Sequence, residues 1–134
     1  MRIRWRAAWF VTLALAVACA PRAATTEEAN WVLLGQREVS DRTDHDAIPV
    51  TAARGEFRRV KFVVRRAPVR FHYVVVRYGN GSFETLDLRE RIPAGDESRA
   101  VNLAGGDRVI RSIEFWYDAD TTGRRALVQA FGLR

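Results

Sequence analysis

Short runs of apolar and β-branched residues, each closed by turn residues, limit the folds open to this chain more than any other feature. From residue 31 onward such runs recur at spacings of about 8–12 residues, and no stretch keeps a helical period. The expected strands span 31–39, 47–50, 57–64, 69–78, 83–88, 98–103, 109–117 and 126–131. This pattern predicts an all-β fold of about eight strands, and we expect a two-sheet antiparallel β-sandwich rather than a barrel.

Three local signals refine this expectation. The segment 69–78 is the longest expected strand, and apolar residues on both faces of its middle predict a central position in a sheet. Asn80 and Gly81 follow it, and their tolerance of positive φ predicts a type I′ hairpin turn. Further along, Ile110 and Ile113 stand three residues apart, which breaks strict alternation and predicts a bulge between them.

The start of the chain has the pattern of an export signal. Three arginines in the first six residues precede the run 7–18, in which Thr12 is the one polar side chain. A basic start, an apolar run of about 7–15 residues and a small-residue end characterise a secretory signal peptide. A membrane-spanning helix needs about 20 apolar residues, so this run is too short to be one. We expect a signal peptide over 1–20, a polar linker over 21–30 and a β-sandwich domain over 31–134, located in the periplasm or cell envelope.

Cys19 is the one cysteine of the chain, and two fates are open to it. The preceding residues 16–18 (Ala-Val-Ala) are similar to a lipobox, in which the cysteine is acylated and becomes the new N-terminus. Alternatively, Cys19 is an ordinary small residue of a discarded peptide. The mass of the mature N-terminus distinguishes these fates. In both cases the domain lacks a disulfide and depends on its core for stability.

The net charge of +6 overstates the charge of the expected mature domain. Four of the 22 Lys and Arg residues precede residue 25, whereas all 16 Asp and Glu residues follow it, which leaves 18 basic against 16 acidic residues. Such a balance is typical of an ordinary solvated surface and does not favour nucleic acid as a partner. We expect membrane contact only through a lipid anchor at Cys19.

Basic and aromatic residues suggest two binding surfaces. Arg59, Lys61 and Arg65 share one face of a strand by the two-residue period, and such a face suits a polyanion, for example lipid phosphate or an acidic glycan. Alternatively, acidic residues on neighbouring strands pair with these charges, which then only discourage aggregation. Trp116 is expected on the face opposite Phe115, where it would stack on sugars unless it packs into the core.

Asp41, Asp44, His45 and Asp46 form the densest group of candidate ligands, and the metal candidates among them are the three aspartates. Their hard oxygen atoms suit Ca²⁺, although such a site usually needs six or more oxygens. Alternatively, they belong to a solvated loop and cap backbone N–H groups in turns. His72 is expected to face the same side of its strand as Val74, and a catalytic role would need a nucleophile and an acid brought to it by folding.

The order of these elements resembles a family of small exported bacterial proteins, many of them lipoproteins, that is a domain of unknown function. The resemblance covers residues 31–132 and rests mostly on turn glycines and core aromatics. Its motifs are W-x-x-L-G (Trp31, Leu34, Gly35), D-x-D-x-I (Asp44, Asp46, Ile48), G-x-F (Gly55, Phe57), the hairpin at Asn80 and Gly81, A-G-x-x-S-R (Ala94, Gly95, Ser98, Arg99), G-G-x-R-x-I (Gly105, Gly106, Arg108, Ile110) and I-x-F-x-Y (Ile113, Phe115, Tyr117). The resemblance implies export and a β-sandwich, and it implies no activity.

We therefore expect a non-enzymatic, exported β-sandwich module of the bacterial cell envelope. It would bind an envelope glycan, an anionic lipid or a protein, or have a structural role. The alternative is an envelope hydrolase or glycan-processing enzyme whose site is built from loops. A cleft in which His45 or His72 meets acidic residues would favour the enzyme, and an exposed aromatic or basic face would favour binding.

Overall fold

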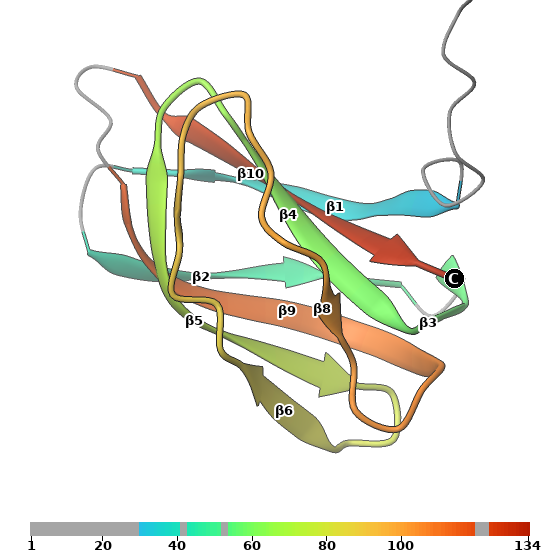
Figure 1. Cartoon of the computed structure of the whole chain (residues 1–134). Helices are drawn as coiled ribbons and strands as arrows, with labels where there is room; N and C mark the ends of the chain where they lie inside the picture. Colours follow the sequence, from blue (N-terminus) through green and yellow to red (C-terminus); the bar gives the residue numbers. More distant parts are fainter. Residues whose placement is uncertain (1–29, 41–42, 52–53, 120–123) are drawn as a thin grey trace, which may run out of the picture.

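The computed structural model describes residues 30–40, 43–51, 54–119 and 124–134. The expected signal peptide, Cys19 and Asp41 lie outside these described residues. Two antiparallel sheets pack face to face in an open sandwich, and the described residues contain no α-helix (Figure 1). The expected all-β sandwich is confirmed. Within the described part of the chain, no helix is long and apolar enough to cross a membrane.

In the described part of the chain, ten strands make up the two sheets. In order across it, the four-stranded sheet contains β1 (Trp31–Val39), β10 (Ala126–Leu133), β4 (Arg59–Arg65) and β8 (Val101–Asn102). The six-stranded sheet contains β2 (Asp44–Pro49), β9 (Arg108–Ala119), β5 (Val69–Tyr78) and β6 (Phe83–Leu86), with β3 (Glu56–Phe57) paired to β9 and β7 (Arg91–Ile92) paired to β5. The two strands beyond the expected number, β3 and β7, are only two residues long. The expected central position of β5 is confirmed, since it lies between β9 and β6.

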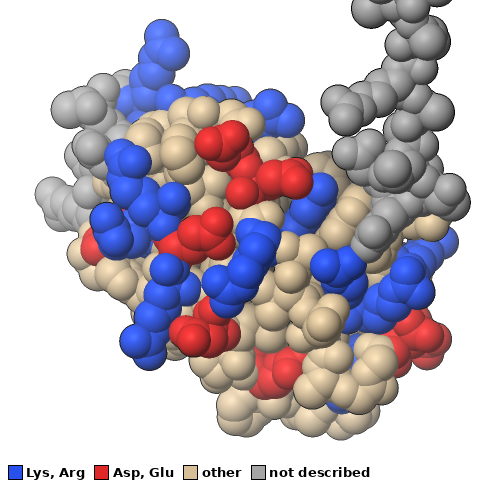
Figure 2. Space-filling model, in the orientation of Figure 1, with Lys and Arg blue, Asp and Glu red and all other residues tan. Residues whose placement is uncertain are grey.

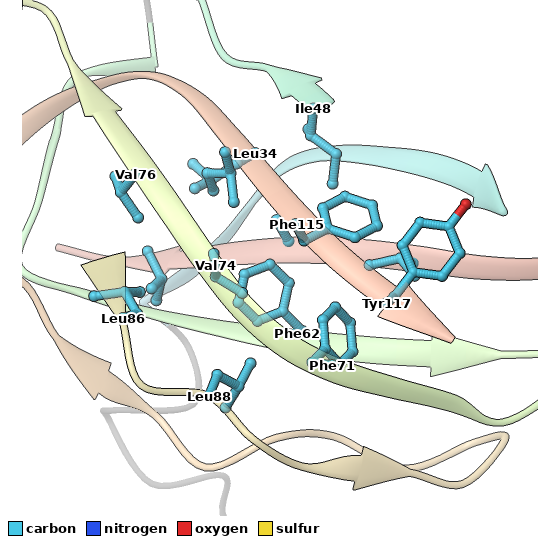
Figure 3. Close-up of a cluster of buried hydrophobic side chains, with 14 of the residues drawn as sticks. Leu34, Ile48, Phe62, Phe71, Val74, Val76, Leu86, Leu88, Phe115 and Tyr117 are labelled. Carbon is cyan, nitrogen blue, oxygen red and sulfur yellow. The ribbon is translucent and has the colours of Figure 1, made fainter. Parts of the chain in front are cut away.

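The core lies between the sheets and follows the two-residue period of the strands. In β4, Val60, Phe62 and Val64 are fully buried. Phe62 meets Phe71 of the opposite sheet at a ring-centroid distance of 5.4 Å, and Phe71 meets Phe115 at 5.8 Å (Figure 3). Aromatic rings from both sheets therefore fill the middle of the sandwich, where burial of apolar area supplies most of the stability.

The hairpin between β5 and β6 differs from the expected type I′ turn. The Tyr78 N–H donates to the Ser82 carbonyl (2.9 Å), and the Gly81 N–H donates to the Tyr78 carbonyl (3.1 Å). In this hairpin only Gly81 has a positive φ, of 88°. The loop is therefore a three-residue connection in which a left-handed glycine follows a type I turn. The Asn80 side chain explains the difference, because its Oδ1 accepts the Ser82 N–H (3.0 Å) across the loop.

The expected strand over 98–103 forms only in part, as β8. The reason is Ser98, a buried residue that bonds to β4 partly through its side chain. Its Oγ accepts the Phe62 N–H (3.0 Å), while its own N–H donates to the Phe62 carbonyl (2.8 Å). A serine hydroxyl that replaces a backbone carbonyl in this way interrupts the ladder. The segment nevertheless covers the edge of β4.

The expected bulge in β9 is confirmed. Ser112 pairs with Arg77 and Ile110 pairs with Tyr78, so Arg111 is the extra residue on its strand. The bulge keeps both isoleucines on the core side although they stand three residues apart.

Candidate functional site

Three aromatic side chains from three strands stack on the outer face of the six-stranded sheet. His45 of β2 and Tyr73 of β5 are both register partners of Trp116 in β9. The His45 and Trp116 ring centroids are 4.2 Å apart at an interplanar angle of 20°, and those of Trp116 and Tyr73 are 4.4 Å apart at 16°. We call these three side chains the aromatic row.

A second bulge, in β5, brings Tyr73 into the row. Phe71 pairs with Tyr117 and Tyr73 pairs with Trp116, so His72 is the extra residue. Phe71 faces the core, whereas both His72 and Tyr73 reach the outer face, as their contacts there show. The expectation that His72 faces the same side as Val74 is therefore wrong, because Val74 is fully buried in the core.

Trp116 lies on the outer face, as expected, but its ring faces are covered. His45 lies on one face of the indole and Tyr73 on the other. A ligand can reach only the edge of this indole, whereas Tyr73, at the end of the row, is 40% exposed. The sequence interpretation missed Tyr73, and it considered His45 only as a ligand or cleft residue rather than as a stacking partner of Trp116. A signal for Tyr73 was present, because the core residues Phe71 and Val74 stand three apart, as do the two isoleucines of β9.

A surface hollow of about 320 Å³ lies at the Tyr73 end of the aromatic row. It is lined by Arg70, Phe71, His72, Tyr73 and Arg89. The hollow arises because β5 pairs with β7 only at residues 69–70 and with β6 only at residues 74–77, which leaves a gap in the ladder between them. Two arginines, a histidine and a tyrosine are therefore among the residues that line this one cavity.

His72 meets an acidic residue in this region. Its Nε2 lies 2.8 Å from Asp118 Oδ2, and the Thr43 hydroxyl donates to the other carboxylate oxygen. The Thr43 bond, the His72 bond and the charges of His72 and Arg70 lower the pKa of Asp118 below its ordinary value. Because an ionised carboxylate only accepts hydrogen bonds, His72 Nε2 carries the donated proton. The imidazole is thereby held in a fixed orientation beside the hollow.

A larger hollow of about 530 Å³ lies at the end of the sandwich near the β5–β6 hairpin, and Arg108 lines it. The Arg108 guanidinium lies 3.8 Å from the Tyr78 ring centroid and donates to the Ala104 carbonyl (2.9 Å) and to Ser82 Oγ (2.8 Å). The charged group of Arg108 therefore makes contacts that hold loops of the domain together. The hollow beside Tyr73 is therefore the stronger candidate site.

The expected basic face lies on the four-stranded sheet, where Arg59, Lys61 and Arg65 share the outer side of β4. Lys61 Nζ is 2.9 Å from Glu97 Oε2 and 4.6 Å from the centroid of the Trp31 ring, and Arg65 is exposed. On the side of the molecule drawn in Figure 2, acidic side chains lie among the basic ones. Neighbouring acids reduce the positive potential that a polyanion would meet. The structure therefore adds no support to the prediction that this face binds a polyanion.

Asp44 and Asp46 belong to β2 rather than to the expected loop. Both carboxylate oxygens of Asp46 accept hydrogen bonds, from Arg37 Nε (2.9 Å) and from the Tyr117 hydroxyl (2.8 Å), and Asp44 Oδ1 accepts the His45 N–H (2.8 Å). Among the described residues, no three His, Cys, Asp or Glu side chains gather as metal ligands. Because Asp41 is not described, the calcium site stays a prediction.

The bond between Tyr117 and Asp46 predicts a loss of stability at alkaline pH. Burial, and then the hydrogen bond to Asp46, raise the pKa of Tyr117 above its ordinary value. Above pH 10 or so the unfolded tyrosine loses its proton while the folded one keeps it, so stability falls as pH rises. We expect Tyr117→Phe to reduce this slope by up to about 1.4 kcal/mol per pH unit.

Urea denaturation between about pH 8 and pH 12 measures the slope. Tyr78 is the comparison residue, because burial and its hydrogen bond to Glu84 raise its pKa in the same direction. We expect Tyr78→Phe to reduce the slope similarly, and both changes together to reduce it further. A slope unchanged in both variants would contradict this account.

Fold and site together define an all-β sandwich domain with an aromatic row on one outer face. A family model described as Domain of unknown function (DUF2541) matches residues 10–132, and the chain belongs to this family. The expected membership of a family of unknown function is confirmed, while the bacterial, exported and lipoprotein character stays a prediction. No curated protein and no solved structure gives a significant match.

Proposed function

We propose that the protein is a non-enzymatic, exported binding module of the cell envelope and that its ligand is a glycan. The observation that carries the proposal is the aromatic row, which ends at a partly exposed Tyr73 beside a hollow. The C–H bonds of a sugar ring pack well on an aromatic face, and aromatic side chains give much contact area for little conformational entropy.

The row also fixes the side chain that would receive the sugar. Trp116 packs against one face of the Tyr73 ring, and His45 packs against the far side of Trp116. A ring held in this way loses little rotational freedom when a ligand binds, so little of the binding free energy is spent on ordering it. Preorganisation of this kind favours a binding role for the face.

One observation supports the alternative that the protein is a hydrolase, namely the contact between His72 and Asp118. In a Ser-His-Asp type triad the nucleophilic hydroxyl bonds to the imidazole, and the carboxylate bonds to its other nitrogen. Here the Thr43 hydroxyl and the imidazole both bond to Asp118, on separate oxygens. This order leaves the hydroxyl unactivated, so the geometry favours binding.

Export and anchoring belong to the same proposal, and the N-terminal sequence supports them. The basic start, the apolar run over 7–18 and the residues before Cys19 have the pattern of a secreted or lipid-anchored chain. Residues 21–30 would then connect Cys19 or the mature N-terminus to the sandwich.

Replacing Tyr73 with alanine is expected to weaken glycan binding at least about fivefold, because loss of an aromatic anchor at a binding site typically costs more than about 1 kcal/mol. The purified full chain would be titrated with N-acetylglucosamine oligomers and sedimented with isolated cell-wall sacculi. The effect on folding should be small, because Tyr73 is partly exposed.

Phe83→Ala is the matched control. Phe83 is an aromatic residue of the same outer face, 64% exposed, but it is not part of the aromatic row. Its replacement is expected to leave binding unchanged. The proposal fails if the unaltered protein binds neither probe, or if Tyr73→Ala and Phe83→Ala bind as well as it does.

A further inference from the structure

Two arginines face each other at the hollow end of the outer face. Arg70 of β5 is the register partner of Arg91 in β7, and both are exposed. Like charges directly opposite each other in an antiparallel pair destabilise a sheet. Arg70 is also the register partner of Asp118, whose two oxygens already bond to Thr43 and His72. The single carboxylate of Asp118 therefore lies among Arg70, His72 and Thr43, which are all cations or hydrogen-bond donors.

Arg89 adds a third guanidinium to the same region and lines the hollow with Arg70. Its Nε lies 3.2 Å from Asp87 Oδ1, but both side chains are more than four-fifths exposed. An ion pair this exposed contributes little, so Arg89 can turn to a ligand at small cost. The Asp118 carboxylate is held on the sheet surface by its bond to His72.

Guanidinium groups recognise carboxylate and phosphate through paired N–H donors, and Tyr73 supplies an aromatic face beside them. The hollow measures about 320 Å³, at the lower end of the roughly 300–1,000 Å³ of ligand pockets, which suits one ring-sized unit rather than a long chain. Charge, aromatic face and size together indicate a ligand that is both anionic and cyclic.

We infer that the hollow binds an anionic sugar unit, whose ring packs on Tyr73 and whose carboxylate or phosphate group is held by Arg70 and Arg89. The inference rests on the proposed glycan-binding function and adds the charge of the unit that is recognised. Arg91 strengthens the local positive potential, and an anion between Arg70 and Arg91 relieves their repulsion.

The test compares three probes on the purified full chain by calorimetry: galacturonic acid oligomers, N-acetylglucosamine oligomers and glucose 6-phosphate. We expect an anionic probe to bind at least about tenfold more tightly than the neutral oligomer, with affinity falling as salt rises. Preference for the galacturonic acid oligomers assigns a carboxylate, and preference for glucose 6-phosphate assigns a phosphate. The double variant Arg70→Gln and Arg89→Gln should lose that preference and keep the weaker binding of the neutral oligomer.

The double variant Arg124→Gln and Arg125→Gln is the charge-matched control, since both are exposed arginines directly before β10 of the other sheet. It should retain the preference for the anionic probe. Equal affinity for anionic and neutral probes, or an unchanged preference in the double variant, overturns the inference but leaves the glycan-binding function standing. Absence of binding to all three probes overturns the inference, and absence of binding to cell-wall sacculi as well overturns the glycan-binding function. Melting temperatures measured without ligand confirm that each variant is folded.

Discussion

Replacing Phe115 with alanine is expected to lower the free energy of unfolding by about 3–5 kcal/mol, the usual cost of removing a buried phenylalanine. The ring is fully buried between the sheets. Its centroid lies 5.8 Å from that of Phe71 and 5.4 Å from that of Tyr117 (Figure 3). Truncation removes apolar contact on both sides and leaves a cavity that the flanking rings, held by their own strands, cannot fill. Urea denaturation of the full chain measures the change.

Phe83→Ala, already the control for glycan binding, also serves here because it deletes the same atoms from an exposed position. We expect it to change stability by less than about 1 kcal/mol. Since a small domain is stable by only about 5–15 kcal/mol, Phe115→Ala should remove a substantial part of the free energy of unfolding. Equal losses in the two variants would mean that the centre of the sandwich is not its main source of stability.

Gly132→Ala is the second change with a large expected effect. A Cβ at this position would lie 2.6 Å from Cδ1 and 2.8 Å from Cγ of Phe57, and both distances are far below van der Waals contact. The Phe57 ring is fully buried and cannot turn aside without disturbing the core. Overpacking of this kind typically costs about 1–3 kcal/mol. The φ of Gly132 is not in the left-handed region, so the cost comes from the close approach rather than from backbone strain.

A double-mutant cycle with Phe57→Leu separates the overlap from other effects. The smaller side chain vacates part of the space that the new Cβ needs, so the two changes together should cost less than the sum of their separate costs. Simple additivity would argue against the overlap. Gly81→Ala is a useful contrast, because nothing lies within 4 Å of its Cβ position and its φ of 88° makes the strain purely conformational.

The candidate site depends on an irregularity in the sheet rather than on a loop. Without the bulge at His72, strict alternation would place His72 and Tyr73 on opposite faces of β5. The bulge places both side chains on the outer face, so that Tyr73 packs on Trp116 and His72 bonds to Asp118. Bulges often redirect side chains in this way at functional sites. The adjoining gap between β6 and β7 then opens the hollow next to the ring.

Several expected features follow from local chemistry, and for that reason they could be predicted. The two-residue period in 57–64 placed Arg59, Lys61 and Arg65 on one face, away from the core, and the step between Ile110 and Ile113 located a bulge. The turn at Asn80 was expected in the right place but with the wrong geometry. Its type depends on a hydrogen bond between the Asn80 side chain and the Ser82 backbone, which propensity alone does not specify.

The amino-acid sequence on its own determines the all-β class, the positions of most strands and the residues that face the core, because the two-residue period is a local property. It also places Trp116 on an outer face. Tertiary structure alone decides that Tyr73 and His45 cover that ring, that Glu97 reaches Lys61, and that a hollow opens beside Arg70. These contacts join residues far apart in the chain, and strand pairing and register, which set them, depend on the whole fold.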